Sequence, residues 1–157
     1  QNVMITNFQQ YFKLVEYFSE FTKERMGIAM GVHNLIQIFD EKYYRNLSGG
    51  ILEAFGKLFY RDLKVYMYPY HDQASDTYIN SENLKVHPRV KELYKFFKNN
   101  GKLVNIDDFD PEILDIFSRT VLKMVRDGED GWEAMLPKGI PEIIKQKRLF
   151  GYSKARK

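Results

Sequence analysis

Two short strand-like segments, with helical patterns between them, constrain the fold of this chain most. Residues 27–31 form an apolar run bracketed by glycines, and residues 63–69 alternate apolar and polar side chains before stopping at Pro69. Short apolar runs and period-two alternation are typical of strands. Apolar residues at helical spacing fill 33–44 and 51–59, and strands connected through helices pair in parallel. The sequence therefore predicts an α/β fold in which a parallel sheet is flanked by helices on both faces.

Further elements are expected on both sides of this pattern. Helical spacing indicates additional helices over 7–24, from Pro88 to just before Gly101, over 118–127 and over 140–149. A weak strand is expected at 103–106. The polar segment 70–87 is the longest connection, and we expect residues 74–80 within it to be mobile.

The ends of these helices carry recognisable capping residues. Thr6 or Asn7 is expected to cap the first helix, Ser118 to cap the helix over 118–127, and Gly128 to end it. We expect a single α/β domain over 1–152 whose C-terminal part is rich in helix. A basic tail, residues 153–157, follows it.

The composition excludes several classes of protein. The chain has no cysteine, which excludes a disulfide framework, an iron–sulfur site and a thiolate nucleophile. No apolar run approaches the roughly 20 residues of a membrane span, and we expect no secretory signal. We therefore expect an intracellular protein, in the cytoplasm or the mitochondrion. Because the chain begins with Gln1, we expect it to be processed or to be part of something longer.

Charge argues against nucleic acid as the main partner. Lysine and arginine number 24 against 21 acidic residues, for a net charge of +3, and nucleic-acid binders usually carry a stronger excess. The basic residues gather locally in 145–157. We interpret this segment as a solvated helix end and tail, with RNA or an anionic membrane surface as the alternative contact.

The middle and the end of the chain carry the motifs on which a family resemblance depends. The middle contains Gly31-Val32-His33-Asn34-Leu35, then Phe39 and Ile51-x-Glu53-Ala54-Phe55-Gly56. The end contains Phe117-Ser118-Arg119-Thr120-Val121-Leu122, then Met135-Leu136-Pro137 and Leu149-Phe150-Gly151-Tyr152. In order and spacing these motifs resemble the nicotinamide/nicotinate mononucleotide adenylyltransferases.

The resemblance implies a Rossmann-like fold of the nucleotidyltransferase type. Enzymes of that family position two substrates and stabilise the charge that develops on the ATP phosphates. It also implies a nucleotide- or phosphate-binding site made by Gly31, His33, Ser118, Arg119 and Lys123, with ATP or an NAD-type nucleotide as the ligand. From the residues themselves we expect no metal site, because no spacing of the histidines and carboxylates demands one, and we expect no catalytic residue in this chain.

The sequence departs from the family at the positions that carry its chemistry. None of the three histidines stands in an H-x-G-H motif, His33 replaces an aspartate, and Leu122 falls where the family has an arginine. Two hypotheses follow. The first is a degenerate nucleotidyltransferase-like domain that serves as a structural or accessory subunit of a larger intracellular assembly. The second is the C-terminal half of an active adenylyltransferase-like enzyme.

Tyrosines supply a further indication of protein partners. Tyr60, Tyr66, Tyr68 and Tyr70 lie on or near the second expected strand. Aromatic residues in strands usually pack in cores, but this number favours a surface for other protein subunits.

Overall fold

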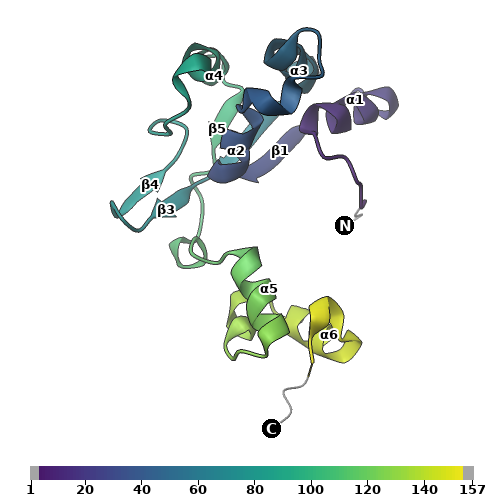
Figure 1. Ribbon diagram of the computed structural model, residues 1–157, viewed down its shortest axis with the longest axis vertical. Helices are drawn as coiled ribbons and strands as arrows, with labels where there is room; N and C mark the ends of the chain where they lie inside the picture. The colour runs from purple at the N-terminus through teal and green to yellow at the C-terminus, as the bar shows by residue number, and fades with distance from the viewer. Residues whose placement is uncertain (1–3, 154–157) are drawn as a thin grey trace. The chain divides into compact units, whose positions relative to one another are not determined.

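The chain folds as an α/β protein that contains a small parallel sheet flanked by helices (Figure 1). The structure is a computed structural model and describes residues 4–153. By its internal contacts the chain divides into two compact units, one up to Phe109 and one from Asp110 onward. Each unit is described by itself. The single domain over 1–152 stays a prediction, and the basic tail lies outside the described residues except for Ser153.

Three parallel strands form the sheet of the first unit. They are β1 (Gly27–Gly31), β2 (Lys64–Tyr68) and β5 (Leu103–Asn105), in the order β1-β2-β5. Met30 lies opposite Met67, and Val65 lies opposite Leu103. All three strands were predicted from the sequence, and the structure confirms them.

The helices of this unit are α1 (Tyr11–Phe21), α2 (Val32–Ile38), α3 (Gly50–Leu58) and α4 (Lys91–Asn99). Short 3-10 turns occupy Glu41–Tyr44, Tyr60–Asp62 and Pro88–Val90. The first helix starts four residues later than expected because Gln10 takes the cap position, where its side chain makes no capping bond. The helix expected over 33–44 is interrupted because the Asp40 carboxylate accepts the backbone N–H of Lys42 and starts a new turn.

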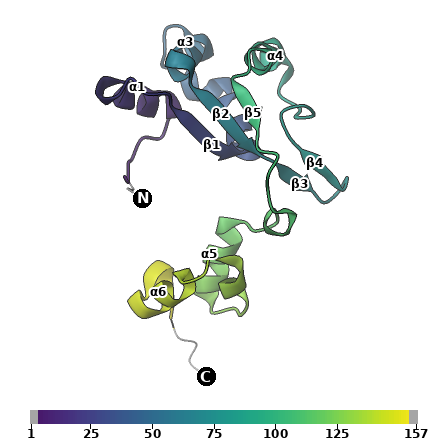
Figure 2. The same ribbon diagram turned by 180° about the vertical axis from the view of Figure 1, so that it is seen from behind.

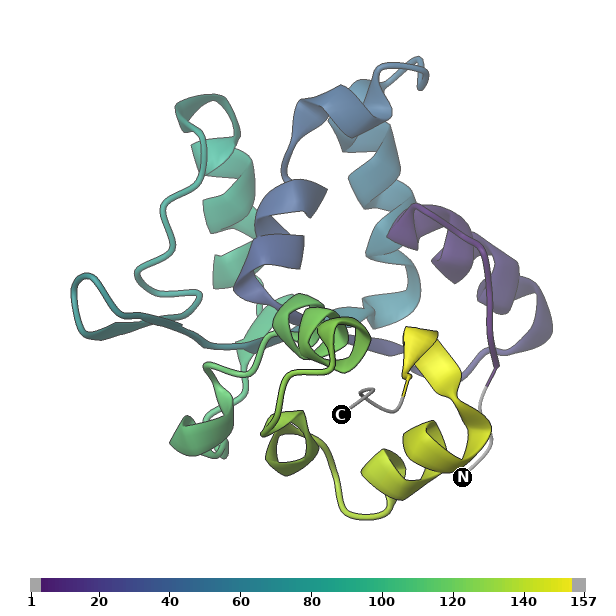
Figure 3. The same ribbon diagram turned by 60° about the horizontal axis from the view of Figure 1, so that its bottom comes forward.

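The core lies on one face of the sheet. Residues paired in a parallel sheet point to the same side, and Val65 and Met67 are fully buried against the helices. Figure 3 shows α2, α3 and α4 on one side of the strands. Phe55 is the centre of an aromatic cluster whose rings contact it at 4.8 to 6.3 Å: Phe39, Tyr44, Phe59 and Phe97.

Within residues 4–109, no helix covers the opposite face of the sheet. Helices were expected on both faces, but in this unit they cover only one. Ala29 and Gly27 are exposed, and Tyr66 keeps 40% of its surface. Figure 2 views the strands from this side, where no helix of the unit crosses them. The Tyr66 ring lies so close to Gly27 that a Cβ at that glycine would come within 2.8 Å of it. Of the four tyrosines singled out in the sequence, Tyr60 and Tyr66 are exposed and Tyr68 and Tyr70 are half-buried. A protein partner for them stays a prediction.

The polar connection expected over 70–87 contains a hairpin, and the mobility expected of residues 74–80 stays a prediction. Strands β3 (Tyr70–Asp72) and β4 (Thr77–Ile79) pair antiparallel. The turn between them is held by the Ser75 hydroxyl, which donates a 2.6 Å hydrogen bond to the Asp72 carboxylate. A side-chain hydrogen bond thus stabilises a turn between two strands in a stretch whose composition indicated a loop.

The second unit is built on α5 (Ser118–Asp127) and α6 (Ile140–Lys147), with 3-10 turns at Pro111–Ile113, Trp132–Met135 and Leu149–Gly151. Its core is made by Val121, Val125, Trp132 and Ile144. Gly128 ends α5 in the left-handed conformation, as predicted. Ser118 is the first helical residue, so the expectation that it caps the helix was wrong: Phe117 holds that position and no side chain caps it.

None of the helices described between residues 4 and 153 has the length and the apolar character that crossing a membrane requires.

Candidate functional site

Gly31 and His33 lie where β1 passes into α2. Gly31 has φ −81°, an ordinary value, and a Cβ there would meet nothing within 4 Å. Its backbone conformation and surroundings therefore do not require a glycine. His33 is exposed, and its ring meets the Tyr70 ring edge-on with centroids 4.8 Å apart.

Ser118, Arg119 and Lys123 lie on α5 of the second unit. Ser118 and Arg119 line the same groove, so the structure brings these two together. Lys123 is not part of the groove lining; its ammonium lies 4.0 Å from the Asp127 carboxylate, one turn along the helix. The two predicted residues of β1 and α2 belong to the first unit, and the three of α5 belong to the second.

The groove around Ser118 and Arg119 is mostly apolar. Its volume is about 420 Å³, and the remaining lining residues are Ile116, Val121, Leu122, Val125, Leu136, Ile144 and Phe150. Among the residues that line the groove, Arg119 is the charged one, and none of them has a carboxylate. Phosphate is bound by converging N–H donors and cations, whereas most of this lining offers only dispersion contacts.

Phe150 is held at this groove by an unusual backbone. Its φ is +57°, and that of Arg148 is +51°. Residues other than glycine rarely adopt this left-handed region, which costs about 1 kcal/mol or more. The Phe150 side chain is 59% exposed, so the chain places a large aromatic group in contact with solvent.

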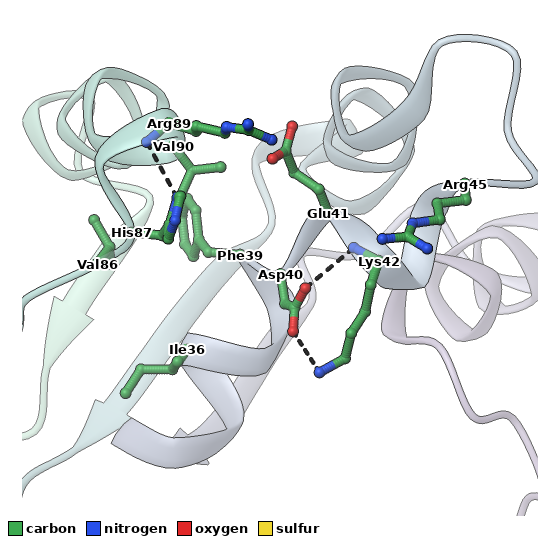
Figure 4. Close-up of a pocket in the computed structure, with 10 residues that line it drawn as sticks. All are labelled: Ile36, Phe39, Asp40, Glu41, Lys42, Arg45, Val86, His87, Arg89 and Val90. Atoms are coloured by element: carbon green, nitrogen blue, oxygen red, sulfur yellow. Dashed lines mark hydrogen bonds and ion pairs between the residues drawn. The ribbon is translucent and has the colours of Figure 1, made fainter.

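A second cavity, of about 330 Å³, lies in the first unit and was not predicted. It lies between the end of α2 with the turn that follows and the segment before α4 (Figure 4). Its lining residues are Ile36, Phe39, Asp40, Glu41, Lys42, Arg45, Val86, His87, Arg89 and Val90. Phe39 and Val90 are 3% and 4% exposed and form its apolar base.

The charges of this cavity are partly paired. The Lys42 ammonium lies 2.6 Å from the Asp40 carboxylate, and its hydrogen bond lowers the pKa of that carboxyl. The positive charge of Arg45 lowers the pKa of the same carboxyl as well. The His87 Nδ1 accepts the backbone N–H of Arg89 at 3.3 Å.

Sequence reasoning missed this cavity because its two walls are separated by about forty residues of chain. The sequence does show two local patterns at the residues that line this cavity. Charged residues follow directly after buried Phe39, and His87 and Arg89 stand on either side of Pro88. Neither pattern is a known motif, and only the tertiary fold brings them together.

A metal centre is not formed among residues 4–153, where no group of three or more potential ligands gathers. His71 and Asp76 pair at 3.0 Å across the hairpin turn.

No family model, curated protein or solved structure matches the chain. The resemblance to the adenylyltransferases therefore rests on the motifs quoted above and stays a prediction.

Proposed function

We propose that this chain is a Rossmann-like domain of the nucleotidyltransferase type that performs no nucleotidyl transfer and serves as an accessory subunit of a larger assembly. We place that assembly in the cytoplasm or the mitochondrion, on the basis of the cysteine-free composition. One observation carries the proposal. Leu122, which stands at the family's arginine position, lines an apolar groove together with Ser118 and Arg119.

The physical argument concerns what the groove can bind. A leucine cannot pair with phosphate, and placing a phosphate dianion against apolar walls removes hydration without replacing it. Ser118 and Arg119 alone offer one hydroxyl and one cation, which supports at most weak nucleotide binding. The same walls suit the apolar side chains of a protein partner, which lose little by leaving water.

We propose a specific occupant: an amphipathic helix of a partner protein that carries an acidic residue beside its apolar face. Such helices bind by laying apolar side chains into a hydrophobic groove. Arg119 supplies the complementary charge, and no carboxylate in the lining opposes an acid. Phe150, already exposed, is the type of aromatic residue that anchors protein interfaces.

The test is the native mass of the protein in extracts, together with variants of the groove. The chain alone has a mass of 18.7 kDa, so wild type should elute in a heavier particle. Leu122→Glu, which places a charge in the groove, should release it to its own mass, and so should Phe150→Ser. Lys123→Gln is the matched control, since it changes the net charge equally on a residue outside the groove.

Two results would contradict the proposal. The first is elution of the wild-type chain at its own mass under native conditions. The second is a heavy particle that survives both groove substitutions, with circular dichroism showing that the variants are folded.

A further inference from the structure

The cavity between α2 and the segment before α4 supports a second site, which does not depend on the groove of the other unit. Its volume of about 330 Å³ lies at the lower end of the range for small-molecule pockets. The buried side chains of Phe39 and Val90 form its base, with Ile36 and Val86 beside them. This part of the cavity suits a flat apolar group.

The polar side of the cavity carries more positive than negative side chains: Lys42, Arg45 and Arg89 against Asp40 and Glu41. Lys42 and Asp40 neutralise one another. Of the remaining charges, Arg45 and Arg89 are positive and Glu41 alone is negative. A guanidinium presents its N–H donors in a planar fork that matches a carboxylate or a phosphate.

His87 adds a directed donor to the same side. Because its Nδ1 accepts the Arg89 N–H, the proton of the neutral ring is on Nε2. Figure 4 shows Arg89 and His87 on the wall that precedes α4 and Arg45 on the turn that follows α2. Donors thus come from both walls.

The geometry points to a binding site for a small organic oxyanion: a carboxylate or phosphate contacted by Arg45 and Arg89, carried on a flat apolar group that lies on Phe39 and Val90. The ligand is bound without covalent chemistry. Carboxylate and phosphate share the chemistry that these arginines recognise, and matched probes distinguish them.

The experiment is a titration of the isotope-labelled full chain by NMR, with three probes that share one ring system. The probes are 1-naphthoate, 1-naphthyl phosphate and the neutral 1-naphthylmethanol. We expect saturable shifts of the backbone amides of Phe39, Arg45 and Arg89 with at least one anion. The neutral alcohol should bind about tenfold more weakly or worse, since hydrogen bonds to charged groups each contribute about 1.5–3 kcal/mol. The tighter of the two anions identifies the oxyanion.

Variants locate the site. Arg45→Gln/Arg89→Gln should weaken the tighter anion about tenfold or more. Lys85→Gln/Lys91→Gln is the matched control: it removes the same charge from neighbouring exposed residues that do not line the cavity, and it should change affinity by less than about twofold. Absence of saturation, shifts confined to the second unit, or equal affinity in the arginine variant would each overturn the assignment.

Discussion

The Tyr94 hydroxyl on α4 donates a 2.8 Å hydrogen bond to the backbone carbonyl oxygen of Ser81. The N–H of Ser81 in turn donates to the Asn105 side chain at the end of β5, at 3.0 Å. Ser81 is 3% exposed, so both of its backbone groups are satisfied by residues distant in sequence. These two bonds fix the start of the segment that forms one wall of the cavity between α2 and the segment before α4.

Tyr94→Phe should therefore lower the free energy of unfolding of the first unit by about 1–2 kcal/mol, because the buried Ser81 carbonyl loses its donor. Urea unfolding followed by circular dichroism measures the change. Tyr60→Phe is the control, since Tyr60 is 50% exposed and should shift stability by less than about 0.5 kcal/mol. Equal effects of the two substitutions would show that the Tyr94 bond contributes nothing.

Alkaline pH should destabilise the first unit through two buried tyrosines. Burial raises the pKa of Tyr44 to about 12 and that of Tyr94 to about 12. In the unfolded chain each titrates near its ordinary value of about 10, so between pH 10 and 12 the folded state holds more protons. Stability is then complete below pH 10 and falls as the pH rises toward 12, by up to about 3 kcal/mol per tyrosine.

Urea midpoints measured from pH 8 to pH 11.5 check this dependence. The double variant Tyr44→Phe/Tyr94→Phe should be less stable at pH 8 but should lose less with rising pH. A slope identical to that of wild type would assign the alkaline effect to other groups.

Two glycines of the first unit should respond to alanine with opposite signs. Gly101 follows α4 with φ +65°, and an alanine there should cost about 1 kcal/mol. Gly56 lies inside α3, is exposed, and has nothing within 4 Å of a Cβ position. Gly56→Ala should therefore stabilise the unit by about 0.5–1 kcal/mol. Thermal unfolding of the two variants compares them, and a common sign would contradict the backbone assignment.

The elements that could be predicted from the sequence are those specified by local pattern. The glycine-bracketed run 27–31, the alternating run before Pro69 and the segment from Ser118 to Gly128 each appear where expected. The open face of the sheet was not foreseen, because the apolar run at β1 indicated burial on both sides. Gly27 and Ala29 count as apolar residues in that run, but they are small and remain exposed in the structure.

The features that were missed depend on side chains competing with the regular pattern or on contacts between distant segments. Asp40 divides a continuous helical pattern by bonding to Lys42, and Ser75 orders a turn that composition described as a loop. The groove beside Ser118 and Arg119 requires Ile144 and Phe150 from later elements. The resemblance that sets Leu122 at an arginine position predicted weaker phosphate binding, but it did not predict the apolar groove that Leu122 lines.

Calorimetric titration of the full chain with ATP, nicotinamide mononucleotide and NAD tests the central claim most directly. An apolar groove with a single cation predicts that none of the three binds at this groove below about millimolar concentration. Any tighter binding should therefore be unchanged in Ser118→Ala/Arg119→Ala, and no adenylyl transfer should occur. Micromolar binding that disappears in Ser118→Ala/Arg119→Ala would contradict the account and favour the nucleotide-binding half of an active enzyme.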